Sequence, residues 1–370
     1  MLLLIPGPVS TRPAVKAAMT RDIAPWDDEF RVYYAGLRAR LPAMAGVSAE
    51  THAALPLQGC GHFITEAAIR SFIAPGGKIL IPMTGAYAER MFRLTREAGR
   101  VPVSLEVPEG QPVAPEAVAA ALATDSAIGH VGLVQSETGS GVVHDPDAVG
   151  AMVGAAGRRM IVDAVSAFGA LPLDLARRAE VDAAVFTSNK CLEGMPGMGF
   201  AIARIDRLEA CAGHAGSWSF DLSDLHAHAQ RAPGTSRFTP PAQVLAALGV
   251  ALDLFDAEGG QPARLARYQA NSRTLYDGML GLGLSPYLSR DVQGPIVMNI
   301  HAPADPNWDL LKFVELLKAR GVVISNFYNT PLPSFRIGCI GAITPADMHF
   351  AVRAIGQALD RLGICQRRAA

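Results

Sequence analysis

The sequence predicts an α/β protein with a mostly parallel central sheet, helices on both faces of that sheet, and a smaller C-terminal α+β domain. Two observations lead to this prediction. Between about residues 53 and 204, short apolar runs alternate with longer stretches of helical periodicity. From about residue 263 onward, helix and short-strand patterns replace that alternation. We therefore expect a large domain followed by a smaller one in the C-terminal part of the chain.

Seven short apolar runs are expected to form the strands of the large-domain sheet. In open sheets of this kind, ligands bind at the carboxyl ends of the strands. The residues that follow each run are therefore candidate site residues. In chain order the runs cover residues 53–58, 78–83, 100–107, 128–135, 158–165, 182–187 and 199–204.

The C-terminal part of the chain has more varied patterns. Residues 212–240 are rich in Gly, Ser, His and Pro, which predicts an irregular stretch. Residues 242–260 have apolar side chains at spacings of three and four and end in glycine, which predicts a long helix. Short strands are expected within the runs 295–302, 321–327 and 334–341.

Composition narrows the functional classes. The chain has 370 residues and is 50% hydrophobic, which is enough for two domains and a large core. The net charge is −1 without any block of like charge, so neither nucleic acid nor an anionic membrane is an expected partner. The N-terminal apolar run is too short for a signal peptide or a membrane span. Five scattered cysteines without a CxxC pair predict no disulfide framework, no metal site and a cytoplasmic location: Cys60, Cys191, Cys211, Cys339 and Cys365.

Lys190 is the first candidate catalytic residue. The chain has only five lysines against 28 arginines, so a lysine at this position needs a reason. It follows the apolar run 182–187, which we interpret as a buried strand. Burial would lower the pKa of the ammonium group and make the amine available as a nucleophile toward carbonyl compounds. The structural alternative is a lysine that extends from a strand end to solvent.

Asp163 ends the preceding apolar run, 27 residues before Lys190. One strand–helix–strand unit would place the two strand ends side by side, so both side chains would face one crevice. A carboxylate and a lysine in that arrangement fit pyridoxal phosphate, because the Asp keeps the ring nitrogen protonated and the Lys forms a Schiff base. The alternative is that Asp163 caps the next helix.

Residues at three further strand ends would complete a site for this cofactor. Gly59 and Gly61 lie between a strand and a helical run, where free backbone N–H groups can bind a phosphate. Tyr87 could stack on a flat ring, and Thr138 could donate to a ring hydroxyl group. Local packing of the tyrosine and turn formation by the threonine are the structural alternatives. The order of these residue types along successive strand ends favours the cofactor site.

Arg336 is expected on a short strand that faces the same crevice. A guanidinium group binds a carboxylate or a phosphonate through two parallel hydrogen bonds. This residue is therefore a candidate receptor for an anionic substrate. A structural ion pair is the alternative.

With these residues in place, the chain resembles the fold-type-I, class V aminotransferases, and within them the 2-aminoethylphosphonate–pyruvate transaminases. The resemblance extends over essentially the whole chain. It implies that Lys190 is the Schiff-base lysine and that Asp163 is the partner of the pyridine nitrogen. The motifs that carry it are "LLLIPGPVSTRPAVKAAM", "PWDDEF", "LQGCGHFITEA", "IVDAVSAFG", "SNKCLEGMPG", "RFTPP" and "FRIGCIG".

The same resemblance implies a large domain over residues 15–255 and a small domain formed by residues 1–14 and 256–370. It also implies a substrate loop and a homodimer. Arg336 would bind the carboxylate of the substrate under a loop formed by Pro6, Gly7 and Pro8. Thr239 would reach the phosphate bound by the neighbouring subunit, so the dimer would share its active sites. The cofactor-binding residues that we expect are Gly59, Cys60, Gly61, His62, Tyr87, Thr138, Asp163, Asn189, Lys190 and Thr239.

The predicted function is a pyridoxal-phosphate-dependent transamination from 2-aminoethylphosphonate to pyruvate, which yields phosphonoacetaldehyde and L-alanine. Two residues depart from the family pattern: Cys60 stands where a hydroxyl residue is usual, and His62 is more like the alanine–glyoxylate relatives. A related transaminase that uses alanine, serine or another small amine with glyoxylate is therefore the nearest alternative. A cysteine desulfurase is disfavoured because Asn189, not a histidine, precedes Lys190. A nonenzymatic cofactor-binding protein is disfavoured because the chain keeps every catalytic position.

Overall fold

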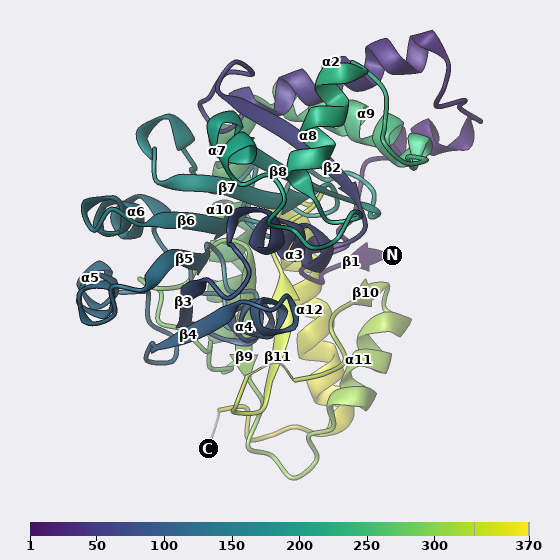
Figure 1. Cartoon of the computed structure of the whole chain (residues 1–370). Helices are drawn as coiled ribbons and strands as arrows, with labels where there is room; N and C mark the ends of the chain where they lie inside the picture. Colours follow the sequence, from purple (N-terminus) through teal and green to yellow (C-terminus); the bar gives the residue numbers. More distant parts are fainter. Residues whose placement is uncertain (329, 369–370) are drawn as a thin grey trace.

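A seven-stranded sheet forms the centre of the part of the chain that the structure, a computed structural model, describes: residues 1–328 and 330–368 (Figure 1). Positions 329, 369 and 370, which fall in the expected small domain, lie outside the described residues. Neighbouring strands are parallel, except that β8 runs antiparallel to both β2 and β7. The predicted, mostly parallel sheet is therefore confirmed. In spatial order the strands are β2 (His52–Gln58), β8 (Met198–Arg204), β7 (Val181–Thr187), β6 (Arg159–Asp163), β5 (Ile128–Val134), β3 (Lys78–Met83) and β4 (Val101–Glu106).

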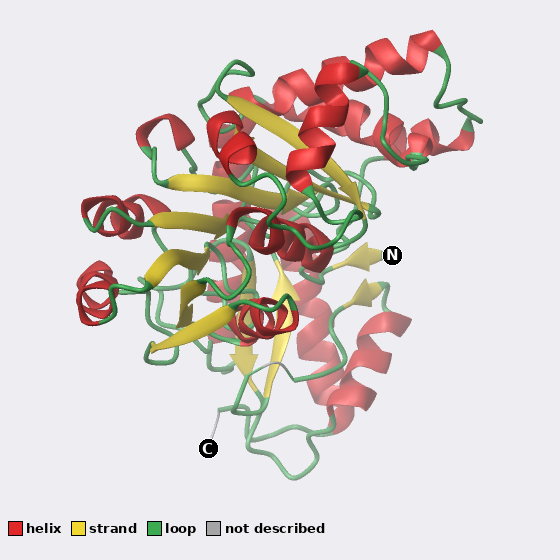
Figure 2. Cartoon of the chain, in the orientation of Figure 1, coloured by secondary structure: helices red, strands yellow, loops and turns green. Residues whose placement is uncertain are grey.

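Helices bury both faces of this sheet, as predicted (Figure 2). Successive side chains of a strand point to opposite faces, so Ile161 packs into one hydrophobic layer and Met160 and Val162 pack into the other. The first layer is covered by α3 (Gly61–Phe72), α4 (Ala86–Glu97), α7 (Ile205–Ala210) and α8 (Leu222–Arg231). The second is covered by α2 (Asp28–Ala43), α5 (Pro115–Thr124), α6 (Pro146–Ala155) and α9 (Ala242–Glu258).

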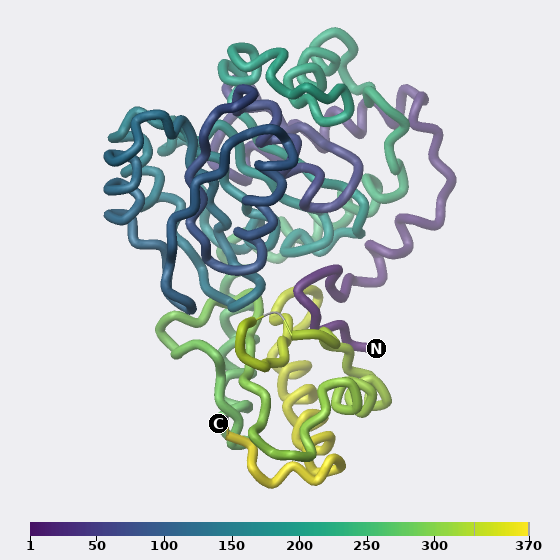
Figure 3. The backbone as a smooth tube through the Cα atoms, turned by 60° about the horizontal axis from the view of Figure 1, so that its bottom comes forward, coloured from purple at the N-terminus to yellow at the C-terminus, as the bar shows by residue number. Residues whose placement is uncertain are grey.

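A separate hydrophobic cluster gathers residues from both ends of the chain, and Figure 3 shows the N-terminal segment beside the C-terminal part. α10 connects this cluster to the sheet, because Tyr268 packs in the sheet layer and Leu275 packs in the separate cluster. β1 pairs in parallel with β10, and β9 pairs antiparallel with β11. The expected domain boundaries remain a prediction. The elements are β1 (Leu2–Leu3), α10 (Gly260–Gly281), β9 (Val297–His301), α11 (Leu310–Ala319), β10 (Val322–Val323), β11 (Ser334–Gly338) and α12 (Pro345–Leu362).

Two local predictions are wrong. The stretch 212–240 is expected to be irregular, but it contains α8, which begins at Leu222 after the N-cap residue Asp221. The Asp221 side chain accepts a hydrogen bond from the N–H of Asp224 at 3.0 Å and so caps the helix. Between β6 and β7 the predicted helix is replaced by a loop that contains only a short 3-10 helix, η2 (Leu175–Arg177). The two strands are nevertheless adjacent and parallel, so their carboxyl ends still meet.

The predicted long helix is confirmed as α9. It ends at Gly259, which adopts a φ of +111° that favours glycine. Two short elements, α1 (Pro13–Ala17) and the 3-10 helix η1 (Ala18–Thr20), pack against α9. Among the described residues, every helix is too short or too polar to cross a membrane.

Candidate active site

A cavity of about 200 Å³ opens at the carboxyl ends of β6 and β7. Asp163 is the last residue of β6, and Lys190 lies three residues beyond the end of β7. Because these strands are adjacent and parallel, they present both side chains to one space. The structure brings eight of the predicted site residues together around this cavity: Gly7, Cys60, Gly61, His62, Tyr87, Asp163, Asn189 and Lys190.

The Lys190 amine lies against the N-terminal segment. Its Nζ donates a hydrogen bond to the carbonyl oxygen of Pro6 at 2.7 Å. Gly7 passes so close that a Cβ atom there would lie 2.4 Å from Cδ of Lys190, which excludes a larger residue. Burial lowers the pKa of Lys190, and the neighbouring Tyr87 only partly offsets this effect. The amine is therefore closer to its neutral, nucleophilic form than a lysine in water.

Asp163 is partly buried and lines the same cavity. Its carboxylate accepts hydrogen bonds from the N–H of Val165 at 3.0 Å and from Oγ1 of Thr65 at 3.4 Å. Burial raises the pKa of Asp163 from its ordinary value of 3.8 to about 6, against the opposing effects of these donors and of Lys190. A carboxyl group in this environment would gain from a cationic ligand. Thr65, on α3, carries no sequence signal that distinguishes it from other helix threonines, and the sequence analysis missed it.

The first turn of α3 forms another part of the cavity wall. Cys60 is the N-cap residue but makes no side-chain cap bond, and Gly61 and His62 follow it along the wall. A Cβ atom at Gly61 would lie 2.9 Å from Cγ1 of Val165, so the close backbone approach requires glycine or a shift of the valine. Backbone N–H groups at a helix start attract anions, and this turn is a suitable place for a phosphate.

Gly59 has a different place from the one predicted. Its N–H donates to the carbonyl oxygen of Gly197 at 2.9 Å, so this group is already used by the protein. Its φ of +136° forms the turn between β2 and α3, and it does not belong to the cavity wall. Gly59 therefore shapes the approach to the site and does not face it.

Tyr87 stands in the first turn of α4, not in an exposed turn, and it lines the cavity. Burial alone would raise the pKa of Tyr87, but the neighbouring Lys190 and Thr138 side chains lower it overall. The guanidinium carbon of Arg90 lies 4.7 Å from the centre of the tyrosine ring. Thr138 is buried in the turn after β5 and is not part of the cavity wall, so its expected contact with a ring hydroxyl group stays a prediction.

Glu137, next to Thr138, is a fully buried carboxyl group that the sequence analysis missed. It accepts hydrogen bonds from the N–H of Gly139 at 2.8 Å and from the N–H of Tyr87 at 3.1 Å. Burial raises the pKa of Glu137 to about 7, although these donors oppose the rise. The signal was present, because Glu137 is an acidic residue two positions after a run that is interpreted as a buried strand.

Arg336 lies on β11 and is 4% exposed. Its Nη1 donates to the carbonyl oxygen of Thr138 at 2.8 Å, and its Nη2 donates to Oγ of Ser325 at 3.3 Å. Its Nε is buried without a hydrogen-bond partner among the described residues. Burial lowers the pKa of Arg336. The alternative role for Arg336 was a structural ion pair, but no acidic side chain among the described residues pairs with it. Its guanidinium group can therefore bind an anionic ligand.

Thr239 does not line the cavity of Lys190. It is exposed and lines a separate hollow of about 300 Å³, together with Phe63 and Phe238. Within one chain it therefore does not join the cavity of Lys190.

Comparison with known families decides the class of the protein. Residues 16–325 match the model of the aminotransferase class V family. The chain belongs to this family. Among curated relatives, it is 44% identical to the 2-aminoethylphosphonate–pyruvate transaminase of Burkholderia ambifaria, over 99% of this chain and 98% of the relative. It is also 44% identical to the protein of the same name from Paraburkholderia phymatum, over 98% of this chain and 97% of the relative.

Solved structures of other aminotransferases have the same fold as this class V aminotransferase. The pyridoxamine–pyruvate aminotransferase of Mesorhizobium loti is similar with a TM-score of 0.88 and 26% identity, over 98% of this chain and 93% of the other. The aspartate aminotransferase of Thermus thermophilus is similar with a TM-score of 0.85 and 26% identity, over 98% and 100% of the two chains. Class V aminotransferases depend on pyridoxal phosphate in general.

The cavity of this class V aminotransferase has features that fit that cofactor. The carboxyl group of Asp163 has a raised pKa, as a carboxyl group does when it lacks a cationic partner. At the start of α3, where a phosphate would bind, the N-cap side chain makes no capping hydrogen bond to the helix. Lys190 has an amine of lowered pKa on the same cavity wall. These three groups match the ring nitrogen, the phosphate and the aldehyde of pyridoxal phosphate.

Proposed function

We propose that this aminotransferase moves the amino group of 2-aminoethylphosphonate to pyruvate and so produces phosphonoacetaldehyde and L-alanine. Curated relatives of that name are 42% to 44% identical over nearly the full length of the chain. The structural observation that carries the proposal is the juxtaposition of Asp163 and Lys190 at adjacent strand ends around one cavity.

Pyridoxal phosphate is the cofactor that we propose for this cavity. Asp163 would hold its ring nitrogen, Tyr87 would lie against its ring, and the first turn of α3 with Cys60 and Gly61 would hold its phosphate. When bound, the cofactor supplies an electron sink for the electron pair that remains after the substrate loses a proton. The fit of these residues supports the proposal.

Lys190 is the residue that we expect to move the proton. Its lowered pKa increases the neutral fraction of the amine, and a neutral amine can accept a proton from the carbon that bears the substrate amino group. The Pro6 carbonyl, which accepts a hydrogen bond from Nζ, holds the amine in the cavity until a ligand arrives. The segment of Pro6 and Gly7 also covers Lys190 on one side and reduces its contact with water.

Arg336 is the proposed receptor for the anionic end of both substrates. A phosphonate and a carboxylate are both oxyanions, so one guanidinium group can serve the amine donor and pyruvate in turn. Its buried and unpartnered Nε supports this role, because a buried donor without an acceptor is unfavourable until a ligand satisfies it.

A homodimer with shared active sites is part of the proposal. Thr239 is exposed beside Phe238, and Trp218 on the same surface is 69% exposed. Exposed aromatic side chains of this size favour contact with another chain. In such a dimer, Thr239 would reach the phosphate-binding end of its partner's cavity.

A transaminase of the alanine–glyoxylate or serine–glyoxylate type is the second candidate. His62 favours it, because a histidine at this position is more like the alanine–glyoxylate relatives and the residue lines the cavity. Burial lowers the pKa of His62, so its imidazole adds no full positive charge to that end.

The test of the proposed function is a panel of amines incubated with the purified protein, pyridoxal phosphate and pyruvate or glyoxylate. We expect alanine to form from pyruvate when 2-aminoethylphosphonate is the donor. Lys190→Ala should abolish this reaction and the covalent attachment of the cofactor, whereas Lys312→Ala, on the exposed side of α11, should retain both. If only alanine or serine reacts, with glyoxylate as acceptor, the second candidate is correct. A wild-type protein that never binds pyridoxal phosphate covalently would contradict both candidates.

A further inference from the structure

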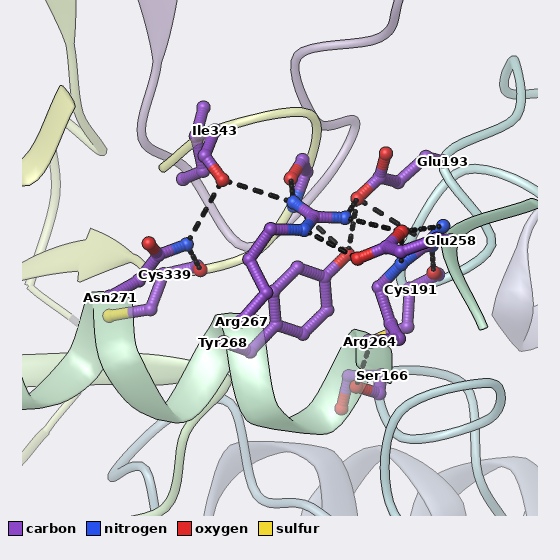
Figure 4. A network of polar contacts seen from close by, with 11 residues as sticks. Ser166, Cys191, Glu193, Glu258, Arg264, Arg267, Tyr268, Asn271, Cys339 and Ile343 are labelled. Atoms are coloured by element: carbon purple, nitrogen blue, oxygen red, sulfur yellow. Dashed lines mark hydrogen bonds and ion pairs between the residues drawn. The ribbon is translucent and has the colours of Figure 1, made fainter. Parts of the chain in front are cut away.

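A polar cluster at the start of α10 is buried between the Lys190 turn and the segment after β11 (Figure 4). Glu193 is at its centre: its Oε1 accepts hydrogen bonds from Oη of Tyr268 and from Nη2 of Arg267, both at 2.7 Å. Arg264 lies 3.5 Å from the same oxygen. Glu258 balances the charge, with oxygens 2.9 Å from Nε of Arg264 and 2.7 Å from Nε of Arg267.

One side of this cluster holds the turn that carries Lys190. The N–H of Glu193 donates to the carbonyl oxygen of Lys190 at 2.9 Å, and Nη1 of Arg264 donates to the carbonyl oxygen of Cys191. Among the described residues, Glu193 is the one residue other than glycine with a positive φ, +57°. A backbone in this unfavourable conformation needs surrounding contacts to hold it, and the cluster supplies them.

The other side of the cluster holds the segment that follows Arg336 in the chain. Nη1 of Arg267 donates to the carbonyl oxygens of Gly341 at 2.5 Å and Ile343 at 3.0 Å. Oη of Tyr268 accepts a hydrogen bond from the N–H of Gly341 at 3.2 Å. The cluster is thus connected by three hydrogen bonds to the chain just beyond β11.

The same segment is attached to the loop over Lys190. The N–H of Ala342 donates to the carbonyl oxygen of Ser10, and the N–H of Gly338 donates to the carbonyl oxygen of Leu4, both at 2.8 Å. These two bonds lie on either side of residues 6–8, so the position of the loop follows the position of the segment 338–342.

We propose that Tyr268 is a positioning residue, which sets the place of Arg336 relative to Lys190 through Glu193 and Gly341. Its hydroxyl group donates to Glu193 on the lysine side and accepts from Gly341 on the arginine side. Burial raises the pKa of Tyr268 well above its ordinary range, so the hydroxyl keeps the proton that it donates. This inference rests on the proposed function, in which a donor spans from Lys190 to Arg336 by its amine and its oxyanion.

The test compares Tyr268→Phe with Tyr276→Phe. Tyr276 is a matched control, because it is also buried on α10 and its hydroxyl donates to the carbonyl oxygen of Leu288 at 3.1 Å, away from the cluster. Three quantities are measured for each variant. The first is the rate at which pyridoxal phosphate attaches to Lys190, which is followed by borohydride trapping and mass spectrometry. The second is the inhibition constant of ethylphosphonate, which has the oxyanion but no amine, and the third is kcat/KM for 2-aminoethylphosphonate.

For Tyr268→Phe we expect kcat/KM to fall about tenfold or more, because a small misplacement of reacting groups has a large effect on rate. The attachment rate and the inhibition constant should stay within about twofold of wild type, because each uses only one end of the site. Tyr276→Phe should leave all three unchanged. Equal kcat/KM in the two variants would overturn the inference, and so would a parallel loss in all three quantities for Tyr268→Phe, which indicates general structural damage.

If Tyr268→Phe does not fold, Arg267→Lys is compared in the same way with Arg273→Lys, an exposed residue of α10. A lysine at position 267 keeps the positive charge but lacks the planar guanidinium group that donates to Gly341, Ile343 and Glu193 together. If the proposed function is wrong, the wild-type protein itself will not react with 2-aminoethylphosphonate. The variants would then be compared with the amino acid that the wild type accepts as the substrate, and with the same acid without its amino group as the inhibitor.

Discussion

Asp163 and Lys190 would both be charged in water at neutral pH, but the cavity shifts the pKa of each toward the neutral form. Their mutual attraction opposes these shifts, and burial outweighs it in both cases. For Lys190 the shift favours reactivity. For Asp163 the shift reflects the unfavourable burial of a carboxylate. A protonated ring nitrogen would offset this free-energy cost, because it would supply the cation that the carboxylate lacks.

This cost predicts a pH-dependent effect of Asp163→Asn on the cofactor-free protein. A pKa raised from 3.8 to about 6 stabilises the fold below pH 4, and this contribution is lost as the pH rises through 6. At pH 8 the buried carboxylate therefore costs up to about 3 kcal/mol, which asparagine avoids. We expect Asp163→Asn to increase the free energy of unfolding at pH 8 but not at pH 4, as measured by urea denaturation. The same change at both pH values would show that burial of charge is not the cause.

At the residue scale, the sequence draws attention to charged residues that end or follow an apolar run, and the catalytic and binding roles of these residues stay predictions. Lys190, Asp163 and Arg336 all stand out in this way. Thr65 and Glu193 could not be found, because their importance depends on contacts with residues 98 and 75 positions away in the chain. Such long-range partners are set by the fold and leave no local pattern.

At the scale of elements, the first turn of α3 begins at a cysteine. The Cys60 thiol is a weaker hydrogen-bond donor than a hydroxyl group would be, and it makes no capping hydrogen bond to the helix. The nearby Nδ1 of His62 lies 3.8 Å from the sulfur atom. The backbone N–H groups of the turn would therefore provide most of the binding to a phosphate.

Cys60→Ser should consequently strengthen the binding of pyridoxal phosphate. One net hydrogen bond is worth about 1 kcal/mol, so we expect a dissociation constant about fivefold lower. Fluorescence titration of the cofactor-free protein measures this change. Cys365→Ser, at an exposed cysteine outside the cavity wall, is the matched control and should have no effect. An unchanged constant for Cys60→Ser would mean that position 60 does not meet the phosphate.

Most elements could be predicted because buried strands and long amphipathic helices have strong periodic patterns. α8 could not, because glycine, serine and histidine around it resemble a loop, and the Asp221 cap is a weak signal by itself. The loop with η2 shows the opposite error. Adjacent parallel strands usually require a helical crossover, but here an irregular segment makes the connection between β6 and β7.

At the scale of the whole molecule, the proposed dimer gives a test by subunit mixing. Lys190→Ala and Thr239→Arg should each be inactive alone, the second because a bulky cation disturbs the partner's phosphate site. A hybrid dimer would contain one site with both residues intact. Refolding the two variants together should therefore restore about a quarter of the wild-type activity if hybrids form at random. Absence of any recovery in a mixture shown to contain hybrids would contradict shared sites.

The sheet order illustrates what the sequence does not reveal at this scale. Apolar runs predicted the strands well, but a run has the same appearance in either direction, so the antiparallel course of β8 between β2 and β7 could not be foreseen. The assembly of the second cluster from both chain ends was suggested only by the family resemblance.

The position of α10 also bears on how the protein would come apart. Tyr268 of this helix packs in the hydrophobic layer of the sheet, and Leu275 packs in the separate cluster. One continuous helix therefore connects the two parts. Unfolding of either part would remove the packing contacts of one end of this helix. We therefore expect the two parts to unfold as a single cooperative unit, because excision of either part would expose an apolar face of α10 to water.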